Sequence, residues 1–273
     1  MNASTCQQQA NLQQLFSSMW ENYLELNPDA KRIYQLFGGE AEVVNDHIAL
    51  RTFNLPQVNI EKLAAPLIVN GYLEGGDYVF ERKKLVAKHF YHPDSTMPKV
   101  FISELLVEEF SDELQQTIKG LIAQVTDDSV ARDDFMYSGR PWQVSFGTYQ
   151  KLLAESEYAA WVAAFGYRPN HFTVSINHLS QFDCIYAVNH LLIEEGFRLN
   201  AVNGMVKGTA LQGLQQSSTL ANKVDVEFCD FTVKIPSCFY EFALRHEVEG
   251  KLFDGFIADS ADKIFESTDV KLA

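Results

Sequence analysis

Two histidines and one glutamate are the residues of this chain whose types and placement could do chemistry. His47 and His171 each stand at the start of one of two similar strand-like segments, Asp46–Thr52 and Asn170–Asn177. In each copy an amphipathic stretch follows and ends at a glycine before an aromatic residue, 24 residues after the first histidine and 25 after the second. These glycine pairs are Gly71-Tyr72 and Gly196-Phe197. A duplicated segment with a histidine at the same place in both copies could bring two imidazoles face to face, so the repeat predicts a metal site.

The alternation of side chains along a strand indicates which residues could share a surface with these histidines. In the second copy, His171, Thr173 and Ser175 lie on one face and apolar residues lie on the other. The same rule places His47 with Arg51, and it places Glu241 on a polar face of a strand near the end of the chain. Two imidazoles and one carboxylate leave coordination positions open, an arrangement that suits Fe(II). We therefore expect His47, His171 and Glu241 to be the metal ligands.

Two further residues could join this site. Glu104 stands in the last strand of the first copy, in the place that Glu241 holds in the second, and is the alternative carboxylate or a fourth group. Arg51 lies four residues after His47, roughly 13 Å along an extended strand. Its guanidinium could bind a substrate carboxylate in a bidentate manner, although an ion pair that holds the sheet is equally compatible with the sequence. His89 and His92 could contact substrate, and His190 is expected to be packed in a helix.

Composition narrows the class of partner. The net charge of −14 argues against nucleic acid and anionic membrane surfaces, because both require a basic footprint. The four cysteines show no C-x-x-C spacing, residues 1–9 lack a signal-peptide pattern, and no apolar run is long enough to span a bilayer. We expect a cytoplasmic protein that acts on a small molecule.

The periodicity predicts an α+β protein in which one domain, residues 1–273, is built from two βαβββ modules. A helical segment, 1–40, precedes the first module, 41–110, and its helix is expected to break at Asn27-Pro28. A helical connector, 111–165, leads to the second module, 166–249, and the tail, 250–273, could fold back as a lid. Within these segments the pattern predicts a helix over 148–165, a strand over 198–202 and a strand over 232–243.

The same residues carry a resemblance to a known family. The duplicated βαβββ unit with two histidines and a glutamate resembles the vicinal oxygen chelate superfamily, whose modules form a half-open barrel around a metal. The chain is more closely similar to the 2-oxoadipate dioxygenase/decarboxylase family. The matching stretches run through nearly the whole chain: Asp46–Phe53, Pro98–Leu105, Ser156–Trp161, Asn170–Thr173, Gln215–Thr219 and Tyr240–Ala243.

The resemblance implies a function. Fe(2+) would be held by His47, His171 and Glu241, and Arg51 would contact the oxo acid. The enzyme would convert 2-oxoadipate and O2 to 2-hydroxyglutarate and CO2, a step of lysine catabolism. Thr173, Ser175, Gln216 and Ser218 are candidates for hydrogen bonds to the substrate or to the ligands. The chain is expected to act as a monomer or homodimer.

Three alternatives stay open at this point. A glyoxalase-type isomerase or lyase would need a general base, which Glu104 could supply. A non-catalytic metal- or ligand-binding protein of the same fold would bind without turnover. Hydrolysis ranks last, because no G-x-S-x-G segment is present.

Overall fold

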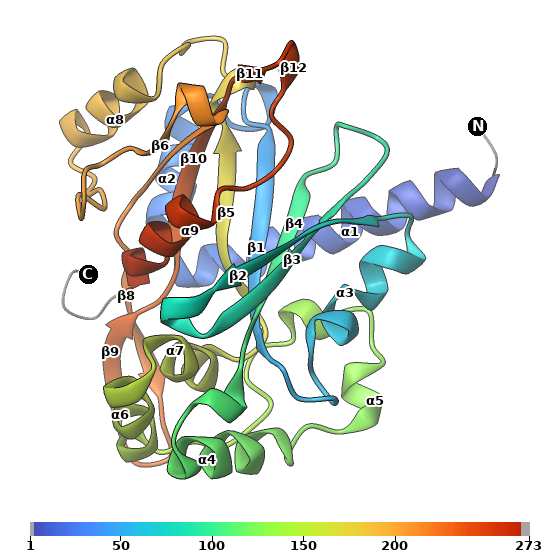
Figure 1. The fold of residues 1–273 in the computed structure, drawn as a ribbon, viewed down its shortest axis with the longest axis vertical. Helices are drawn as coiled ribbons and strands as arrows, with labels where there is room; N and C mark the ends of the chain where they lie inside the picture. Colours follow the sequence, from blue (N-terminus) through green and yellow to red (C-terminus); the bar gives the residue numbers. More distant parts are fainter. Residues whose placement is uncertain (1–2, 269–273) are drawn as a thin grey trace. The chain divides into compact units, whose positions relative to one another are not determined.

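The computed structural model describes residues 3–268 of the chain, and it is an α+β protein, as predicted (Figure 1). The end of the predicted tail, 269–273, lies outside the described residues. The helices are α1 Ala3–Leu26, α2 Pro28–Leu36, α3 Ile60–Val69, α4 Asp112–Ile122, α5 Asp127–Val130, α6 Phe146–Glu155, α7 Glu157–Phe165, α8 Ile185–Glu194 and α9 Ala258–Ile264. The strands are β1 Asn45–Phe53, β2 Leu73–Phe80, β3 Leu85–Tyr91, β4 Lys99–Leu105, β5 Pro169–Ser175, β6 Lys207–Thr209, β7 Leu214–Ser218, β8 Lys223–Glu227, β9 Thr232–Pro236, β10 Phe239–Arg245, β11 Glu247–Val248 and β12 Lys251–Leu252.

The first module has the predicted order β1-α3-β2-β3-β4. Asn59 begins α3, because its side chain accepts a hydrogen bond from Lys62 N. Gly71 ends the helix region with a φ of 96°, and the amide of Tyr72 donates to Leu67 O. A helix end of this kind requires a left-handed residue, which glycine adopts without steric cost.

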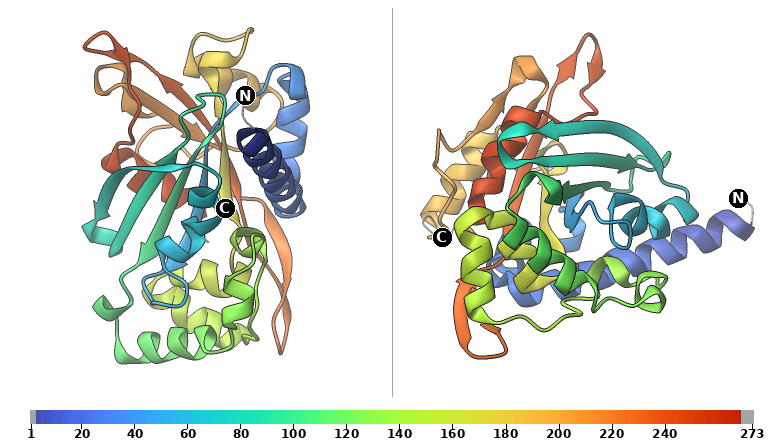
Figure 2. Two further views of the ribbon diagram at one scale, coloured as in Figure 1. Left: turned by 90° about the vertical axis from the view of Figure 1, so that its right-hand side faces the viewer. Right: turned by 60° about the horizontal axis from the view of Figure 1, so that its bottom comes forward.

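The second module repeats this arrangement with β5-α8-β6-β7-β10. Gly196 has a φ of 83°, and the amide of Phe197 donates to Leu192 O, as Tyr72 does in the first module. The repeated glycine-aromatic pair is therefore the same helix-terminating turn written twice. The second module differs from the first by an inserted hairpin, β8–β9, which Figure 2 shows as a long two-stranded arm.

Strand pairing follows the same scheme in both modules. In the first, β2, β3 and β4 pair in that order. In the second, β6 and β7 are antiparallel, β7 and β10 are antiparallel, and β10 runs parallel to β5. The register of β10 against β5 sets Phe239 opposite His171 and Glu241 opposite Thr173. This register brings the strand of the predicted carboxylate beside the strand of the second histidine.

Several predicted elements differ from the structure. The predicted helix over 148–165 is two helices, because Ser156 ends α6 and caps α7 by accepting from Ala159 N. The predicted strand over 232–243 is interrupted after Pro236, which has no N–H to donate to a ladder. The predicted strand over 198–202 forms only an isolated antiparallel bridge, from Leu199 to Thr219, and β6 forms later, at Lys207–Thr209. The carbonyls of this irregular segment are bonded by the buried Lys207 ammonium, which contacts Asn200 O and Val202 O.

The contacts within the chain divide it into two compact units. Unit 1 comprises Met1–Tyr23, Ala49–Asn170 and Val224–Ile235, and unit 2 comprises Leu24–Ile48, His171–Lys223 and Pro236–Ala273. The division crosses β1 after Ile48 and β5 after Asn170. Unit 2 therefore contains both predicted histidine ligands and Glu241.

The N-terminal helices break where the sequence predicts. Asn27 separates α1 from α2, and its side chain accepts from Ala30 N at the start of α2.

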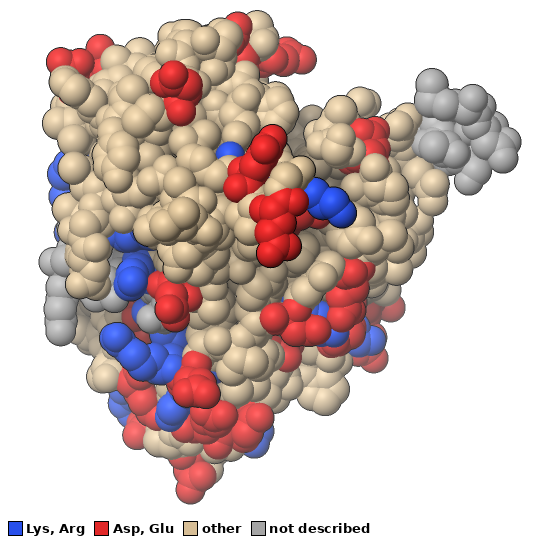
Figure 3. All heavy atoms as spheres, turned by 45° about the horizontal axis from the view of Figure 1, so that its top comes forward, with Lys and Arg blue, Asp and Glu red and all other residues tan. Residues whose placement is uncertain are grey.

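None of the helices in the described part of the chain combines the length and apolar composition that a membrane span requires. On the face that Figure 3 shows, acidic side chains lie beside the basic ones, so the basic groups there do not form a patch of one sign.

Candidate metal centre

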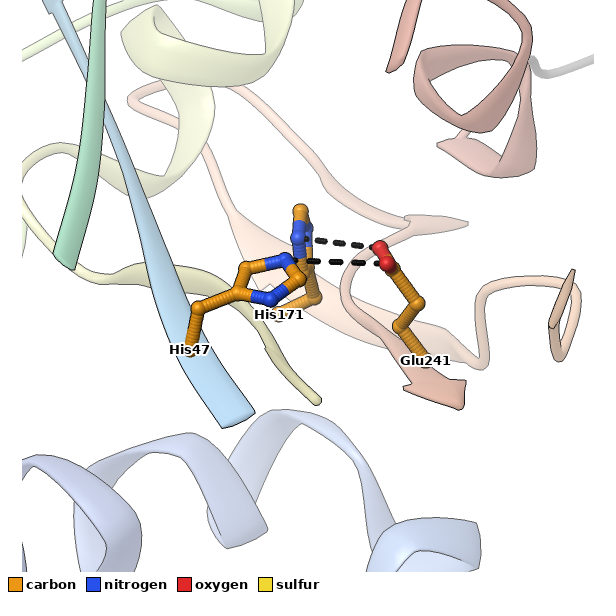
Figure 4. A group of neighbouring side chains, drawn as sticks. All are labelled: His47, His171 and Glu241. Atoms are coloured by element: carbon orange, nitrogen blue, oxygen red, sulfur yellow. Dashed lines mark ion pairs between the residues drawn. The ribbon is translucent and has the colours of Figure 1, made fainter. Parts of the chain in front are cut away.

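The structure brings His47, His171 and Glu241 together inside unit 2 (Figure 4). They come from β1, β5 and β10, and one potential ligand atom from each lies within 4.8 Å of those of the other two. Glu241 Oε1 is 3.6 Å from His47 Nε2, and Glu241 Oε2 is 3.2 Å from His171 Nε2. All three side chains are buried. The two rings are almost perpendicular, with centroids 5.6 Å apart, and both direct a nitrogen toward the carboxylate.

The orientation of His47 is fixed by its neighbour in sequence. His47 Nδ1 lies 2.7 Å from Asp46 Oδ1, so the neutral imidazole donates its proton to that carboxylate. The lone pair then resides on Nε2, on the side of Glu241. Thr173 Oγ1 lies 3.1 Å from this nitrogen and can donate its hydroxyl proton to it. A carboxylate behind the imidazole is the usual way in which proteins orient a metal-binding histidine.

Glu241 is a buried carboxyl with incomplete hydrogen bonding. Gln216 Nε2 donates to Oε1 at 2.5 Å, whereas Oε2 accepts no hydrogen bond from the described residues. Burial, partly offset by His47 and Gln216, raises the pKa of Glu241 to about 7. Without a cation this group titrates near neutral pH rather than in mild acid, because an ionised carboxylate in a buried position is costly.

The charges around the cluster fit a divalent cation. Asp46, Glu241 and Arg245 have buried side chains at the cluster and together carry one net negative charge when all three are ionised. A divalent ion would reverse that excess and would bond the Glu241 oxygen that has no donor. Two imidazole nitrogens and one carboxylate oxygen are also a donor set that binds first-row metals with coordination positions left open. His47, His171 and Glu241 therefore fit the role of metal ligands that the sequence predicts for them.

Three residues around His47 were not assigned a role from the sequence. Asp46 lies in the repeated segment, and Arg245, four residues after Glu241, lies on the same strand face, but no sequence pattern pairs them. In the structure Arg245 Nε lies 2.6 Å from Asp46 Oδ2, and both side chains are buried. Although burial alone would raise the pKa of Asp46, the Arg245 guanidinium and the His47 hydrogen bond hold it well below its usual range. Phe256, from the tail, packs edge-on against His47 with ring centroids 4.8 Å apart.

The four hydrogen-bonding candidates of the second module contact protein groups. Thr173 contacts His47 and Gln216 contacts Glu241, so both act directly on predicted ligands. Ser175 Oγ lies 2.8 Å from His178 Nδ1, and Ser218 Oγ lies 2.8 Å from the tail residue Ser267. Thr173 and Gln216 therefore surround the ligands, whereas Ser175 and Ser218 bind elsewhere in unit 2.

Arg51 is fully buried in unit 1, on the same strand as His47. Its guanidinium carbon lies 5.1 Å from the ring centroid of Tyr158 and 5.0 Å from that of Trp161. Glu157 Oε1 lies 3.8 Å from Arg51 Nη1. The two aromatic faces hold the planar guanidinium in place, which a lysine ammonium could not reproduce.

Glu104 is not a member of the His47, His171 and Glu241 group that the structure shows among its described residues. Its Oε2 accepts from Ile60 N at 2.9 Å, so the half-buried carboxylate caps the start of α3 in unit 1. Burial raises its pKa, and the Ile60 hydrogen bond opposes that effect. Of the remaining histidines, His89 is buried against Tyr78, whereas His190 is exposed on α8, contrary to the prediction of a packed side chain.

Comparison with known proteins gives consistent results. The family model described as 2-oxoadipate dioxygenase/decarboxylase matches residues 7–251. The chloroplastic 2-oxoadipate dioxygenase/decarboxylase of Arabidopsis thaliana is 34% identical over 275 residues, which cover 90% of this chain and 74% of the relative.

Two crystal structures are closely similar. Hydroxyglutarate synthase from Oryza sativa, in complex with 2-oxoadipate, is 33% identical with a TM-score of 0.86, covering 95% of this chain and 92% of that one. A protein from Shewanella frigidimarina, named as a hydrolase, is 56% identical with a TM-score of 0.88, covering 90% and 98%. The family match and the Arabidopsis relative confirm the resemblance seen in the sequence. With a buried His-His-Glu group on the expected strands, the chain belongs to the 2-oxoadipate dioxygenase/decarboxylase family.

Proposed function

We propose that this protein is an Fe(II)-dependent dioxygenase that decarboxylates 2-oxoadipate. The reaction consumes one O2 per oxo acid and yields 2-hydroxyglutarate and CO2, which balances in carbon, hydrogen and oxygen. The family membership supports this substrate, since the rice relative is a hydroxyglutarate synthase in complex with 2-oxoadipate. The observation on this chain that carries the proposal is the buried Glu241 carboxylate facing two imidazole nitrogens.

The donor set supports iron as the metal. His47 Nε2, His171 Nε2 and a Glu241 oxygen are two imidazoles and one carboxylate, the ligand combination typical of non-haem Fe(II) oxygenases. When bound, a ferrous ion would supply open positions for a chelating 2-oxo acid and for O2, and would pass to O2 the electrons that the oxidised acid provides. The residues of this chain hold the ion, orient the acid and exclude water.

Each surrounding residue has a defined part in this proposal. Asp46 keeps the proton on Nδ1 of His47, so that Nε2 faces the metal. Gln216 holds one Glu241 oxygen and leaves the other for bonding. Arg51, whose guanidinium packs on the rings of Tyr158 and Trp161, binds a carboxylate of the substrate. Phe256 covers one face of His47 with an apolar ring, which keeps water from that side of the ligand.

The alternative activities differ from the proposed one in the groups or the co-substrate that they require. A glyoxalase-type isomerase or lyase needs a second carboxylate as its base, but Glu104 is bonded to Ile60 N and Asp46 is paired with Arg245. Hydrolysis, the activity in the name of the Shewanella relative, would proceed without oxygen. Dependence on oxygen therefore separates the proposed reaction from both alternatives.

The test is a stoichiometry measured on reconstituted protein. The purified protein is loaded with Fe(II) without air, given 2-oxoadipate, and then mixed with a known amount of O2. We expect equal amounts of O2 consumed, CO2 released and 2-hydroxyglutarate formed, with none in the His47→Ala protein. Iron binding followed by no oxygen uptake on 2-oxoadipate would contradict the proposal.

A further inference from the structure

We infer that Asp46 and Arg245 are a positioning pair that couples the orientation of His47 to the seating of the tail segment 253–256. This inference rests on the proposed metal centre and deepens it. It begins with a bidentate contact: Arg245 Nε lies 2.6 Å from Asp46 Oδ2, and Nη2 lies 2.9 Å from Oδ1. The same Oδ1 is 2.7 Å from His47 Nδ1. The guanidinium therefore fixes the carboxylate that in turn fixes the imidazole.

The remaining nitrogen of the same guanidinium binds the tail. Arg245 Nη1 donates to Phe253 O at 3.0 Å and to Gly255 O at 2.9 Å. The amide of Phe253 donates to His246 O, so both the N–H and the carbonyl of Phe253 are bonded to residues at the end of β10. All three guanidinium nitrogens thus make hydrogen bonds: Nε and Nη2 bind the carboxylate, and Nη1 binds the tail. Lysine, with a single ammonium, could not make both sets of contacts.

Phe256 connects the tail with the predicted metal ligand His47. Its ring is perpendicular to that of His47, with centroids 4.8 Å apart, and the Arg245 guanidinium carbon lies 5.5 Å from its centroid. Phe256 is 8% exposed, so the ring is buried against these two side chains. Arg245 therefore contacts both the carboxylate that orients the imidazole and the tail segment that packs against it.

Burial makes this arrangement sensitive to small changes. The Asp46 and Arg245 side chains are each 5% exposed. Removing one charge leaves the other buried without its partner, which is strongly unfavourable. Coupling between two sites is also reciprocal in free energy. If a bound metal holds His47 in place, it must therefore also stabilise the tail contacts. Loss of the tail contacts must in turn weaken metal binding.

The first arm of the test measures metal affinity without substrate or oxygen. Co(II) is titrated into metal-free protein and followed by its visible absorption. We expect Asp46→Asn and Arg245→Lys to bind Co(II) about 10- to 100-fold more weakly than the unaltered protein. Arg132→Lys is the matched control, because Arg132 and Asp134 form an exposed pair in unit 1, and its affinity should not change.

The second arm measures hydrogen exchange of the amides of residues 250–257, with and without Co(II). We expect Co(II) to slow this exchange in the unaltered protein and in Arg132→Lys, but not in Arg245→Lys. Phe256→Ala removes the ring between the tail and His47 but keeps the Arg245 contacts with Asp46 and the tail carbonyls. It should therefore weaken Co(II) binding less than Arg245→Lys does and retain part of the metal effect on exchange. This variant also keeps the test decisive if Asp46→Asn does not fold.

Two results would overturn the inference: Co(II) affinity unchanged in folded Arg245→Lys, or tail exchange in the unaltered protein that does not respond to Co(II). A purely structural role for Arg245 predicts both, together with lower stability. The proposed function fails separately. Protein that shows the coupling but consumes no O2 with 2-oxoadipate would refute the reaction and leave the positioning pair intact.

Discussion

The two βαβββ modules agree in their first strands and differ in their last. His47 is the third residue of β1, and His171 is the third residue of β5. The third residue of β10 is Glu241, but the third residue of β4 is Phe101, whose ring contacts Tyr78 and Phe80 at centroid distances of 5.4 and 6.4 Å. The duplication therefore supplies two histidines and only one carboxylate. A strand repeated in sequence need not repeat its chemistry, because one copy can use the position for packing.

A second difference lies four residues after each histidine. The first module has Arg51, enclosed by aromatic rings, and the second has Ser175, which contacts His178. One module thus offers a permanent positive charge where the other offers a hydroxyl. Under the proposed function, the modules divide the work: the second supplies most of the metal ligands, and the first supplies the group that binds the substrate.

The comparison of the two carboxylates gives the largest expected effect. Glu241→Gln should abolish tight metal binding, with at least ~100-fold loss of affinity, because the charge that balances the cation is removed. Glu104→Gln, a matched change in the other module, should bind metal as the unaltered protein does. Metal content after gel filtration, measured by atomic emission, checks both. Equal metal loss in the two variants would mean that Glu104 is a ligand.

The pH dependence follows from the raised pKa of Glu241, about 7. A carboxyl with a raised pKa holds its proton more tightly in the folded state. Its contribution to stability is therefore present at pH 4.5 and lost as the pH rises through about 7. For the metal-free protein the loss is on the order of 3 kcal/mol. Denaturant unfolding in EDTA between pH 4.5 and 8 measures it, and metal affinity should rise over the same range.

Two variants separate this effect from other titrations. Glu241→Gln should flatten the stability profile of the metal-free protein over this range, whereas Glu104→Gln should leave most of the slope. Asp46 does not interfere, because its pKa is lowered and its stabilisation is lost only in stronger acid. A slope that persists in Glu241→Gln would assign the titration to another group.

The third prediction concerns Arg51 and Ser175. Arg51→Lys should raise the KM for 2-oxoadipate about tenfold or more, since a charge-assisted bidentate contact is replaced by a point charge. Ser175→Ala should change KM little, because its hydroxyl contacts His178. Steady-state oxygen uptake measures both constants. An unchanged KM in Arg51→Lys would leave Arg51 with only the structural role that the sequence also allowed.

The smallest expected effect is on the helix that Glu104 caps. Glu104→Gln replaces a charged acceptor of the Ile60 amide by a neutral one and should cost about 0.5 kcal/mol of stability or less. Thermal unfolding measures this loss, with Glu108→Gln as the comparison for removal of a nearby charge. A loss of several degrees together with lost metal would contradict the capping role.

Much of this arrangement could be predicted from the sequence, because local patterns determine it. The repeated histidine and the glycine-aromatic turn are local signals. Strand alternation also predicts the face of β10 on which Glu241 lies, which is the face beside His171 and Thr173. The place of Glu104 could not be predicted, since it depends on the start and register of β4 rather than on spacing alone. Glu104 is three residues after Phe101 and thus faces the opposite side of the strand, toward α3.

The partners of His47 were also beyond the sequence. Asp46 and Arg245 are 199 residues apart and meet only because β1, β5 and β10 fold into place. Phe256 was expected only as part of a tail that could fold back. Long-range pairs of this kind carry no periodic signal, so the environment of a ligand is harder to predict than the ligand itself.

The most direct measurement is a crystal structure of the iron-loaded protein, with anomalous scattering recorded on both sides of the iron edge. We predict one strong iron peak about 2.0–2.2 Å from His47 Nε2, His171 Nε2 and a Glu241 oxygen, with no protein ligand on the remaining positions. A peak held by other side chains, or iron bound without Glu241, would contradict this prediction.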